Sequence, residues 1–305
     1  MGSTLSRRLQ LALPELRGWG RRLAEHLLIP ALACVMPWPL YYRLLYRLAG
    51  SERLLHQACQ QAIAGHQAVL GTQPDEEWLR RFRLTLLIDR ADAFLTVSRS
   101  RRWLDRHVDV TGAWPHGPFM GITFHLGGGM WSIPHMARSG HRAAFLSIRF
   151  QLADFGHQRL LYHLARFRMW TVERAGGAAT IYTGGSAAQI RQAISRRLCV
   201  IGLIDVPPHQ AERGRQPVRL LGRAASLPTG LLDIAAAENV PAVAFVMRVD
   251  WKTGRRKLDI HALPSPASEP RIEALAKLLD RELSLNPEAW HLWLCAPSFF
   301  QSAES

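Results

Sequence analysis

The sequence contains few cysteines, and none of them are paired in a metal-binding or redox spacing. The four cysteines are widely separated: Cys34, Cys59, Cys199 and Cys295. Scattered cysteines are typical of small core residues in a reducing compartment and argue against a disulfide framework or a zinc site. A Walker loop, a G-x-G-x-x-G fingerprint and an H-E-x-x-H motif are also missing. We therefore expect neither a bound cofactor nor a metal.

Acidic residues are scarce as well. The chain has 24 acidic against 38 basic residues, mostly arginines, and a formal net charge of +14. Such a surplus favours polyanionic surroundings: an acidic carrier protein, an anionic membrane surface or nucleic acid. The sequence has no zinc finger, no RNP-type aromatic pattern and no basic-region zipper. A carrier protein and a membrane are therefore the expected partners, and nucleic-acid binding is kept only as a third hypothesis.

A long uninterrupted apolar run is absent from the first 50 residues. Residues 27–40 are apolar but contain three prolines, and arginines follow at Arg43 and Arg47. A membrane span needs roughly 20 apolar residues. Aromatic side chains and arginines beside a shorter apolar run suit the headgroup boundary. We expect residues 1–50 to form a helical segment that lies in the membrane interface, with a core helix of the folded domain as the alternative.

The remaining residues, 51–305, have the pattern of one large domain. With 48% hydrophobic residues the chain can bury a full core. Helical patterns fill residues 51–107, and short apolar runs typical of buried strands then alternate with helices. The expected strands are 119–124, 143–148, 198–204, 241–247 and 257–262, with a short strand and turn over 218–223. This order predicts an α/β fold with a central, mostly parallel or mixed sheet flanked by helices.

One stretch combines a strand end with a potential base. The apolar run 119–124 ends on His125, and Gly127, Gly128 and Gly129 follow before an apolar segment begins. A strand, a glycine turn and a helix together place an imidazole at the carboxyl edge of a sheet, where α/β enzymes usually hold their chemistry. The glycines allow close backbone approach and leave N–H groups to face a ligand. A structural histidine is the alternative.

Other polar residues follow expected strands or lie on an expected helix. The strand 198–204 ends on Asp205, which is a second site candidate, although a helix or loop cap is equally consistent with its position. Arg149 follows the strand 143–148, and Arg166 and Arg168 lie at the end of a helix expected from residue 158 to 167. These three arginines are candidates for binding an anionic substrate, with a solvated basic face as the alternative.

Together these segments resemble the bacterial late lipid A acyltransferases, a branch of the lysophospholipid acyltransferase superfamily. The resemblance covers residues 25–300 and lies in the order and spacing of the motifs. These are the basic apolar beginning, the strand into His125, the strand into Asp205, the segment Leu227-Pro228-Thr229-Gly230 and the tail from Asn286 to Trp293. The family's histidine is followed by an acid five positions later. Met130 stands there, so this chain is a divergent member of the pattern.

The resemblance implies an O-acyltransferase at the cytoplasmic face of the inner membrane. It would move a fatty acyl group from acyl carrier protein or acyl-CoA to a hydroxyl of a lipid A-like or other lipid acceptor. His125 corresponds to the family's base, Asp205 to its second acid and Arg166 to its arginine, with Arg168 close by. Gly127 to Gly129 would donate N–H groups to the oxyanion. Because of Met130, a homologue that binds lipid or carrier protein without turnover is the alternative.

Overall fold

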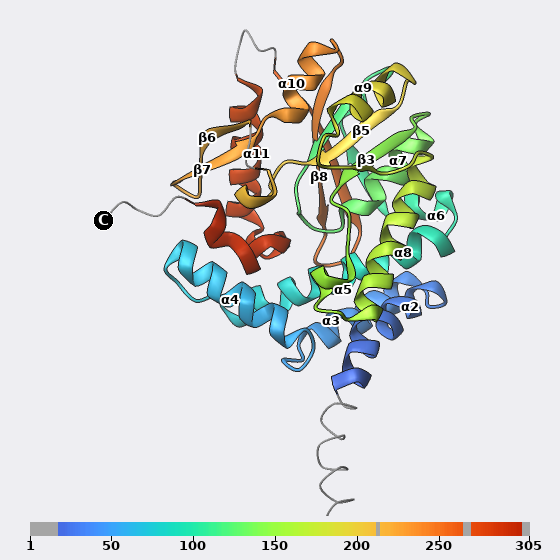
Figure 1. Cartoon of the computed structure of the whole chain (residues 1–305). Coiled ribbons are helices and arrows are strands. Elements are labelled where there is room, and N and C mark those ends of the chain that lie inside the picture. Colours follow the sequence, from blue (N-terminus) through green and yellow to red (C-terminus); the bar gives the residue numbers. More distant parts are fainter. Residues whose placement is uncertain (1–17, 212–213, 265–269, 301–305) are drawn as a thin grey trace, which may run out of the picture.

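The computed structural model describes residues 18–211, 214–264 and 270–300. Its centre is a seven-stranded sheet in the order β1-β9-β8-β2-β5-β3-β4, and helices pack around it (Figure 1). The strands are β1 (Val108–Thr111), β2 (Met120–Thr123), β3 (Ala143–Ser147), β4 (Ile181–Tyr182), β5 (Cys199–Leu203), β8 (Ala242–Val249) and β9 (Arg256–Ala262). The predicted α/β class is confirmed.

The sheet is mixed, with a parallel centre. Strands β8, β2, β5, β3 and β4 run parallel to one another, whereas β9 is antiparallel to β8 and parallel to β1. The central strands consist of apolar residues that are buried on both faces, as parallel strands between helix layers require. The carboxyl ends of β2, β5 and β3 therefore lie along one edge.

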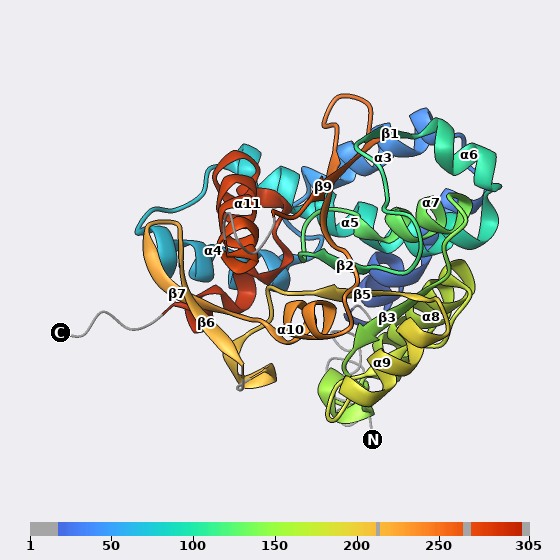
Figure 2. The same cartoon turned by 90° about the horizontal axis from the view of Figure 1, so that it is seen from above.

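Helices cover both faces of the sheet. Figure 2 shows α9 and α10 on one side of the strands and α7 on the other. The longer helices are α3 (Trp38–Ala49), α4 (His56–Leu70), α5 (Glu76–Ser98), α8 (Arg159–Gly176), α9 (Ala187–Ser195), α10 (Gly230–Ala237) and α11 (Arg271–Leu285). Shorter helical segments are α2 (Ile29–Ala31), α6 (Arg101–Arg106), α7 (Ser132–Arg138), η6 (Pro287–Ala289) and η7 (His291–Phe299).

The N-terminal segment is helical and packs on α5. Trp38, Tyr41 and Leu45 of α3 are buried in the common core. The opposite side leaves apolar groups exposed, among them Trp19 (59%) and Val35 (75%). Residues 1–17 of the predicted interface segment lie outside the described residues. In the part of the chain that the structure describes, no helix is both long and apolar enough to cross a bilayer.

Several elements differ from the sequence pattern, among them the edge strands β1 and β4, which were not expected. The helix expected over 158–167 extends to Gly176, and Gly177 ends it in the left-handed region at φ +70°. The second half of this helix has no clear apolar stripe among its charged residues, so the sequence pattern did not predict its full length. Another difference is a hairpin of β6 (Arg215–Leu220) and β7 (Arg223–Pro228). A short strand and turn were expected over 218–223, but β6 begins earlier, inside the expected loop, and β7 occupies the expected start of a helix. Backbone pairing between the two strands overrides the loop-like composition of β6.

Candidate active site

His125 and Asp205 form a hydrogen-bonded pair at the carboxyl edge of the sheet. The ring Nδ1 of His125 lies 3.0 Å from Oδ1 of Asp205. The backbone N–H of His125 also donates to both oxygens of that carboxylate, at 3.0 and 2.9 Å. These bonds fix the tautomer with hydrogen on Nδ1, so the lone pair of Nε2 is free. Among the described residues, Nε2 has no hydrogen-bond partner.

Strand register explains why these residues meet. Thr123 pairs with Leu203 across β2 and β5, so His125 and Asp205 are equivalent positions, two residues beyond each strand end. The same register continues to β3, where Phe145 pairs with Ile201. Arg149 follows β3 by two residues, as Asp205 follows β5, so both residues come after strand ends on the same edge. The Arg149 side chain is exposed and lies over the Tyr182 ring, with 4.2 Å from Cζ to the ring centroid.

Asp205 is held by a second donor. Its carboxylate is 0% exposed, and the indole Nε1 of Trp290 donates to Oδ2 at 2.9 Å. With the N–H and the ring of His125, the buried charge therefore has three donors, which is the condition for burying a carboxylate without a large penalty. Trp290 belongs to the C-terminal tail, and its role as an anchor for Asp205 was not predicted from the sequence.

The environment raises the pKa of His125. Burial by itself disfavours the imidazolium, but the charge and hydrogen bonds of Asp205 outweigh burial and raise the pKa above its ordinary value. The positive charge of Arg168 opposes this increase. The side chain of His125 is nevertheless 33% exposed, so part of the ring is open to solvent. An accessible base with a buried carboxylate behind it is the arrangement of a His–Asp pair in acyl transfer.

Met130, five positions after His125, is a core residue. It lies in a short 3-10 turn after the glycines, and its side chain is 5% exposed within the core. The acid that contacts the imidazole comes instead from the end of β5. Asp205 is thus the carboxylate that orients this ring.

The three glycines are not equivalent. Gly127 has φ +56°, an added Cβ would lie 2.5 Å from the carbonyl oxygen of Met247, and its N–H already donates to Ala289 at 2.9 Å. This bond removes Gly127 from the predicted oxyanion donors. The N–H groups of Gly128, which is buried, and Gly129, which is half-buried, make no hydrogen bond to a described residue, which leaves both as candidate donors.

A buried ion pair, Asp92 with Arg256, supports the glycine turn from below. Both side chains are 0% exposed, and the carboxylate binds Nη2 of Arg256. A Cβ on Gly128 would collide with Oδ2 of Asp92, so this close approach requires glycine. The guanidinium lies over the Trp131 ring at 4.3 Å. Neither charged residue stands out in the sequence, because each sits inside an ordinary helix or strand pattern.

Of the two arginines predicted on α8, Arg168 faces the site. It forms a two-pronged pair with Asp89 of α5, with Nη2 2.8 Å from Oδ1. Burial raises the pKa of Asp89, but Arg168 reverses this effect and the pKa falls below its ordinary value. Arg166 lies about 200° around the helix from Arg168. It is exposed and stacks on Tyr162, with its Cζ 5.7 Å from the ring centroid, so the structure does not bring it to His125.

The C-terminal tail is bound to the loop that follows β2 by backbone pairing. The N–H of His291 donates to the carbonyl of His125 at 2.9 Å, and Leu126 bridges to Trp290. The ring Nε2 of His291 lies 2.7 Å from the carbonyl oxygen of Gly127. Burial lowers the pKa of His291, which keeps this ring neutral. The tail motif noted in the sequence therefore positions the His125 loop.

The assembled site contains an oriented imidazole, two unpaired backbone N–H groups and nearby guanidinium groups. This set can accept a proton from a hydroxyl, bind an oxyanion and attract an anionic substrate. Within the described ranges no cluster of three or more metal-ligating side chains is found. No protein-family model matches the chain, and no curated protein is similar to it.

Proposed function

We propose that this protein is an O-acyltransferase that moves an acyl group from a thioester to a hydroxyl, with His125 as the general base. One observation supports this most: Nδ1 of His125 is bound to the buried carboxylate of Asp205, while Nε2 is free at an open sheet edge. An imidazole held in this way is suited to hydroxyl chemistry near neutral pH.

The reaction follows from the geometry. Nε2 of His125 takes the acceptor's hydroxyl proton as the oxygen attacks the thioester carbonyl carbon. In this proposal the N–H groups of Gly128 and Gly129, which bond to no described residue, donate to the resulting oxyanion. When the C–S bond breaks, the leaving thiolate takes the proton from the imidazolium, and the new ester is released. Asp205 stays ionised throughout and stabilises the imidazolium.

The charge of the chain favours two partners for this reaction. Acyl carrier protein is acidic, and a net charge of +14 favours its approach, with acyl-CoA as an alternative donor. Exposed Arg149 and partly exposed Arg168 suit the phosphate groups of such donors or of a lipid A-like acceptor. Exposed apolar residues of the N-terminal helices, including Trp19 and Val35, suit docking to the cytoplasmic face of an inner membrane.

A transfer assay with labelled acyl thioesters, a lipid extract as acceptor and the full chain tests the proposal. We expect His125→Ala to reduce the transfer rate by about 10²–10⁴-fold, the usual contribution of a general base. His56→Ala, which removes an exposed histidine from α4, is the matched control and should leave the rate unchanged. Transfer that persists in folded His125→Ala would refute the role of His125 as base.

The alternative is a homologue without turnover, and the replacement of the usual acid by Met130 is the observation that favours it. Its signature is binding of acyl carrier protein by the wild-type chain, with no transfer to any acceptor fraction and no effect of His125→Ala on the binding. The same assay, supplemented by a carrier-protein binding measurement, separates the two functions.

A further inference from the structure

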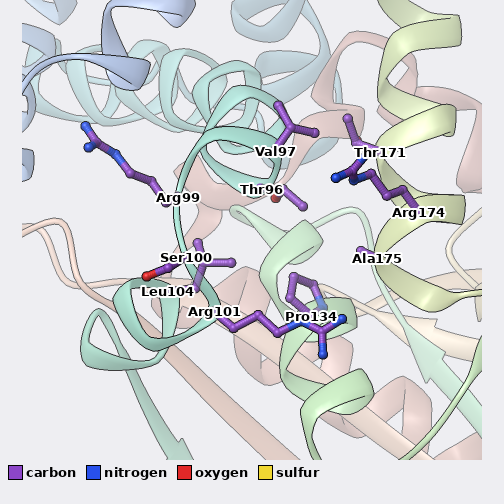
Figure 3. A pocket seen from close by; sticks show the side chains of 10 residues that line it. All are labelled: Thr96, Val97, Arg99, Ser100, Arg101, Leu104, Pro134, Thr171, Arg174 and Ala175. Carbon is purple, nitrogen blue, oxygen red and sulfur yellow. The ribbon is translucent and has the colours of Figure 1, made fainter.

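A small cavity lies away from His125, between the end of α5, the start of α6, α7 and α8. Its volume is about 280 Å³. Its lining residues are Thr96, Val97, Arg99, Ser100, Arg101, Leu104, Pro134, Thr171, Arg174 and Ala175 (Figure 3). Pockets for drug-sized molecules usually measure about 300–1,000 Å³. This cavity therefore suits a group the size of a headgroup better than a whole acyl chain.

The cavity is distinct from the His125 site. On α5, Thr96 is seven residues beyond Asp89, which is two helical turns or about 10 Å. On α8, Thr171 and Arg174 lie one to two turns beyond Arg168. The ion pair of Asp89 and Arg168 thus stands between the two places.

The cavity carries unbalanced positive charge. Arg101 and Arg174 are exposed, and within the described chain neither has a hydrogen bond or an ion pair; the guanidinium of Arg174 lies over the Trp170 ring, with Cζ 5.5 Å from the ring centroid. No acidic side chain lines the cavity. Acids on the adjoining helices are engaged elsewhere: Asp105 binds Arg138, and Glu173 accepts from the N–H of Thr180 at 2.8 Å. Two like charges facing one small space repel each other until an anion enters.

The orientation of the side chains supports an anion between these two arginines. Figure 3 shows the guanidinium group of Arg174 beside Thr171 and that of Arg101 beside Pro134, whereas Arg99 points away from both. Ser100 adds a hydroxyl, whose oxygen accepts from the N–H of Trp103 while its hydrogen remains free to donate. The hydroxyls of Thr96 and Thr171 already donate to backbone carbonyls and contribute no donor.

Arg99 links this cavity to the N-terminal helices. Its Nη2 donates to the carbonyls of Ala33 and Met36, at 2.8 and 2.7 Å. Val35, between these two residues, is 75% exposed. The exposed Val35 side chain and the positively charged cavity therefore lie on adjoining segments, an arrangement that suits a surface in contact with lipid headgroups.

We propose that this cavity is a binding site for a phosphate group, held by Arg101 and Arg174 with help from Ser100. A phosphate fits because guanidinium groups bind it with two parallel hydrogen bonds each and because it offers several acceptor oxygens. The phosphate can belong to an anionic lipid headgroup or to a soluble phosphate compound. This inference does not depend on acyl transfer.

Binding measurements on the full chain test the site without any turnover. The probes are inorganic phosphate and glycerol 3-phosphate by calorimetry, and phosphatidylcholine vesicles with or without phosphatidic acid by co-sedimentation. Arg101→Gln/Arg174→Gln should weaken binding at least about tenfold, because the variant loses the hydrogen bonds from both charged guanidinium groups to the phosphate. The control is Arg102→Gln/Arg159→Gln, which removes two exposed arginines from the same helices outside the cavity.

The pattern over the probes identifies the source of the phosphate. If Arg101→Gln/Arg174→Gln no longer binds phosphatidic acid vesicles, and glycerol 3-phosphate competes with these vesicles for the wild-type chain, the ligand is a lipid headgroup. If the variant loses only the binding of inorganic phosphate and glycerol 3-phosphate, the ligand is a soluble phosphate compound. Equal losses in the two double variants would mean general charge attraction and overturn the proposal, as would a wild-type chain that binds none of the probes. Matching thermal unfolding of both variants verifies that they are folded.

Discussion

Two acid–base pairs flank the glycine turn, and they differ mainly in the exposure of the basic partner. In both pairs the carboxylate is completely buried: Asp205 faces His125, and Asp92 faces Arg256. The side chain of His125 is 33% exposed, whereas that of Arg256 is 0% exposed and lies between the rings of Trp38 and Trp131. One pair therefore has a free lone pair for a substrate, and the other has every charge enclosed.

This difference in exposure suits the two pairs to different roles, one reactive and one structural. A buried ion pair is weak evidence for net stability, but removing one partner leaves an uncompensated charge. Asp92 and Arg256 thus hold the underside of the turn and make its shape depend on glycine at position 128. His125 and Asp205 use the same kind of contact at an open edge, where the contact sets the tautomer and the pKa of a base.

Asp205→Asn should have the largest effect. Loss of the orienting carboxylate lowers the rate in Ser–His–Asp triads by about 10⁴-fold, and a similar loss of acyl transfer is expected here. Asp205 raises the pKa of His125, so its removal lowers that pKa, and the acidic limb of the pH–rate profile should move to lower pH. A pH profile of the residual activity measures both effects. An acidic limb that stays in place would show that Asp205 does not set this pKa.

Asp92→Asn should affect stability first. It leaves Arg256 buried beside a neutral amide, and breaking a buried pair in this way costs about 3–5 kcal/mol in the free energy of unfolding. The double variant Asp92→Leu/Arg256→Met removes both charges and should recover most of that loss. Urea unfolding monitored by tryptophan fluorescence gives the comparison. A double variant as unstable as the single one would mean that the charges themselves stabilise the turn.

Trp290→Phe tests how the surroundings of Asp205 affect the His125–Asp205 pair. It removes the Nε1 donor from Oδ2 of Asp205, a hydrogen bond to a charged group that contributes about 1.5–3 kcal/mol. The carboxylate then keeps more of its negative charge toward the imidazolium, so the pKa of His125 should rise. The acidic limb should therefore move to higher pH, opposite to the shift in Asp205→Asn. A shift in the same direction would argue against Trp290 as an anchor of this carboxylate.

Gly128→Ala and Gly129→Ala form the smallest and most closely matched test. A Cβ at 128 meets the carboxylate of Asp92 and should lower the free energy of unfolding by about 1–3 kcal/mol, as overpacking does. A Cβ at 129 meets nothing within 4 Å, so the change should stay within about 0.5 kcal/mol. Thermal or urea unfolding of both variants measures the difference. Equal losses would place the steric constraint elsewhere in the turn.

Part of this site can be predicted from the local sequence pattern. The apolar runs before His125 and Asp205 predict strands, and the ends of parallel strands share an edge. That reasoning also brings Arg149 to the edge, and β2, β3, β5, β8 and β9 lie close to the expected ranges. The two arginines on α8 could not be ranked from local pattern, because their value as site residues depends on which face of the helix meets α5.

Local composition thus specifies the α/β class, the strand ends and a histidine beside glycines, since hydrophobic periodicity and turn chemistry act over a few residues. The partner of His125, the enclosed pair of Asp92 with Arg256, the tail anchor Trp290 and the cavity between α5 and α8 depend on packing between residues far apart in the chain. The distance from His125 to Asp205 is 80 positions in sequence and 3.0 Å in space, and strand register makes this connection.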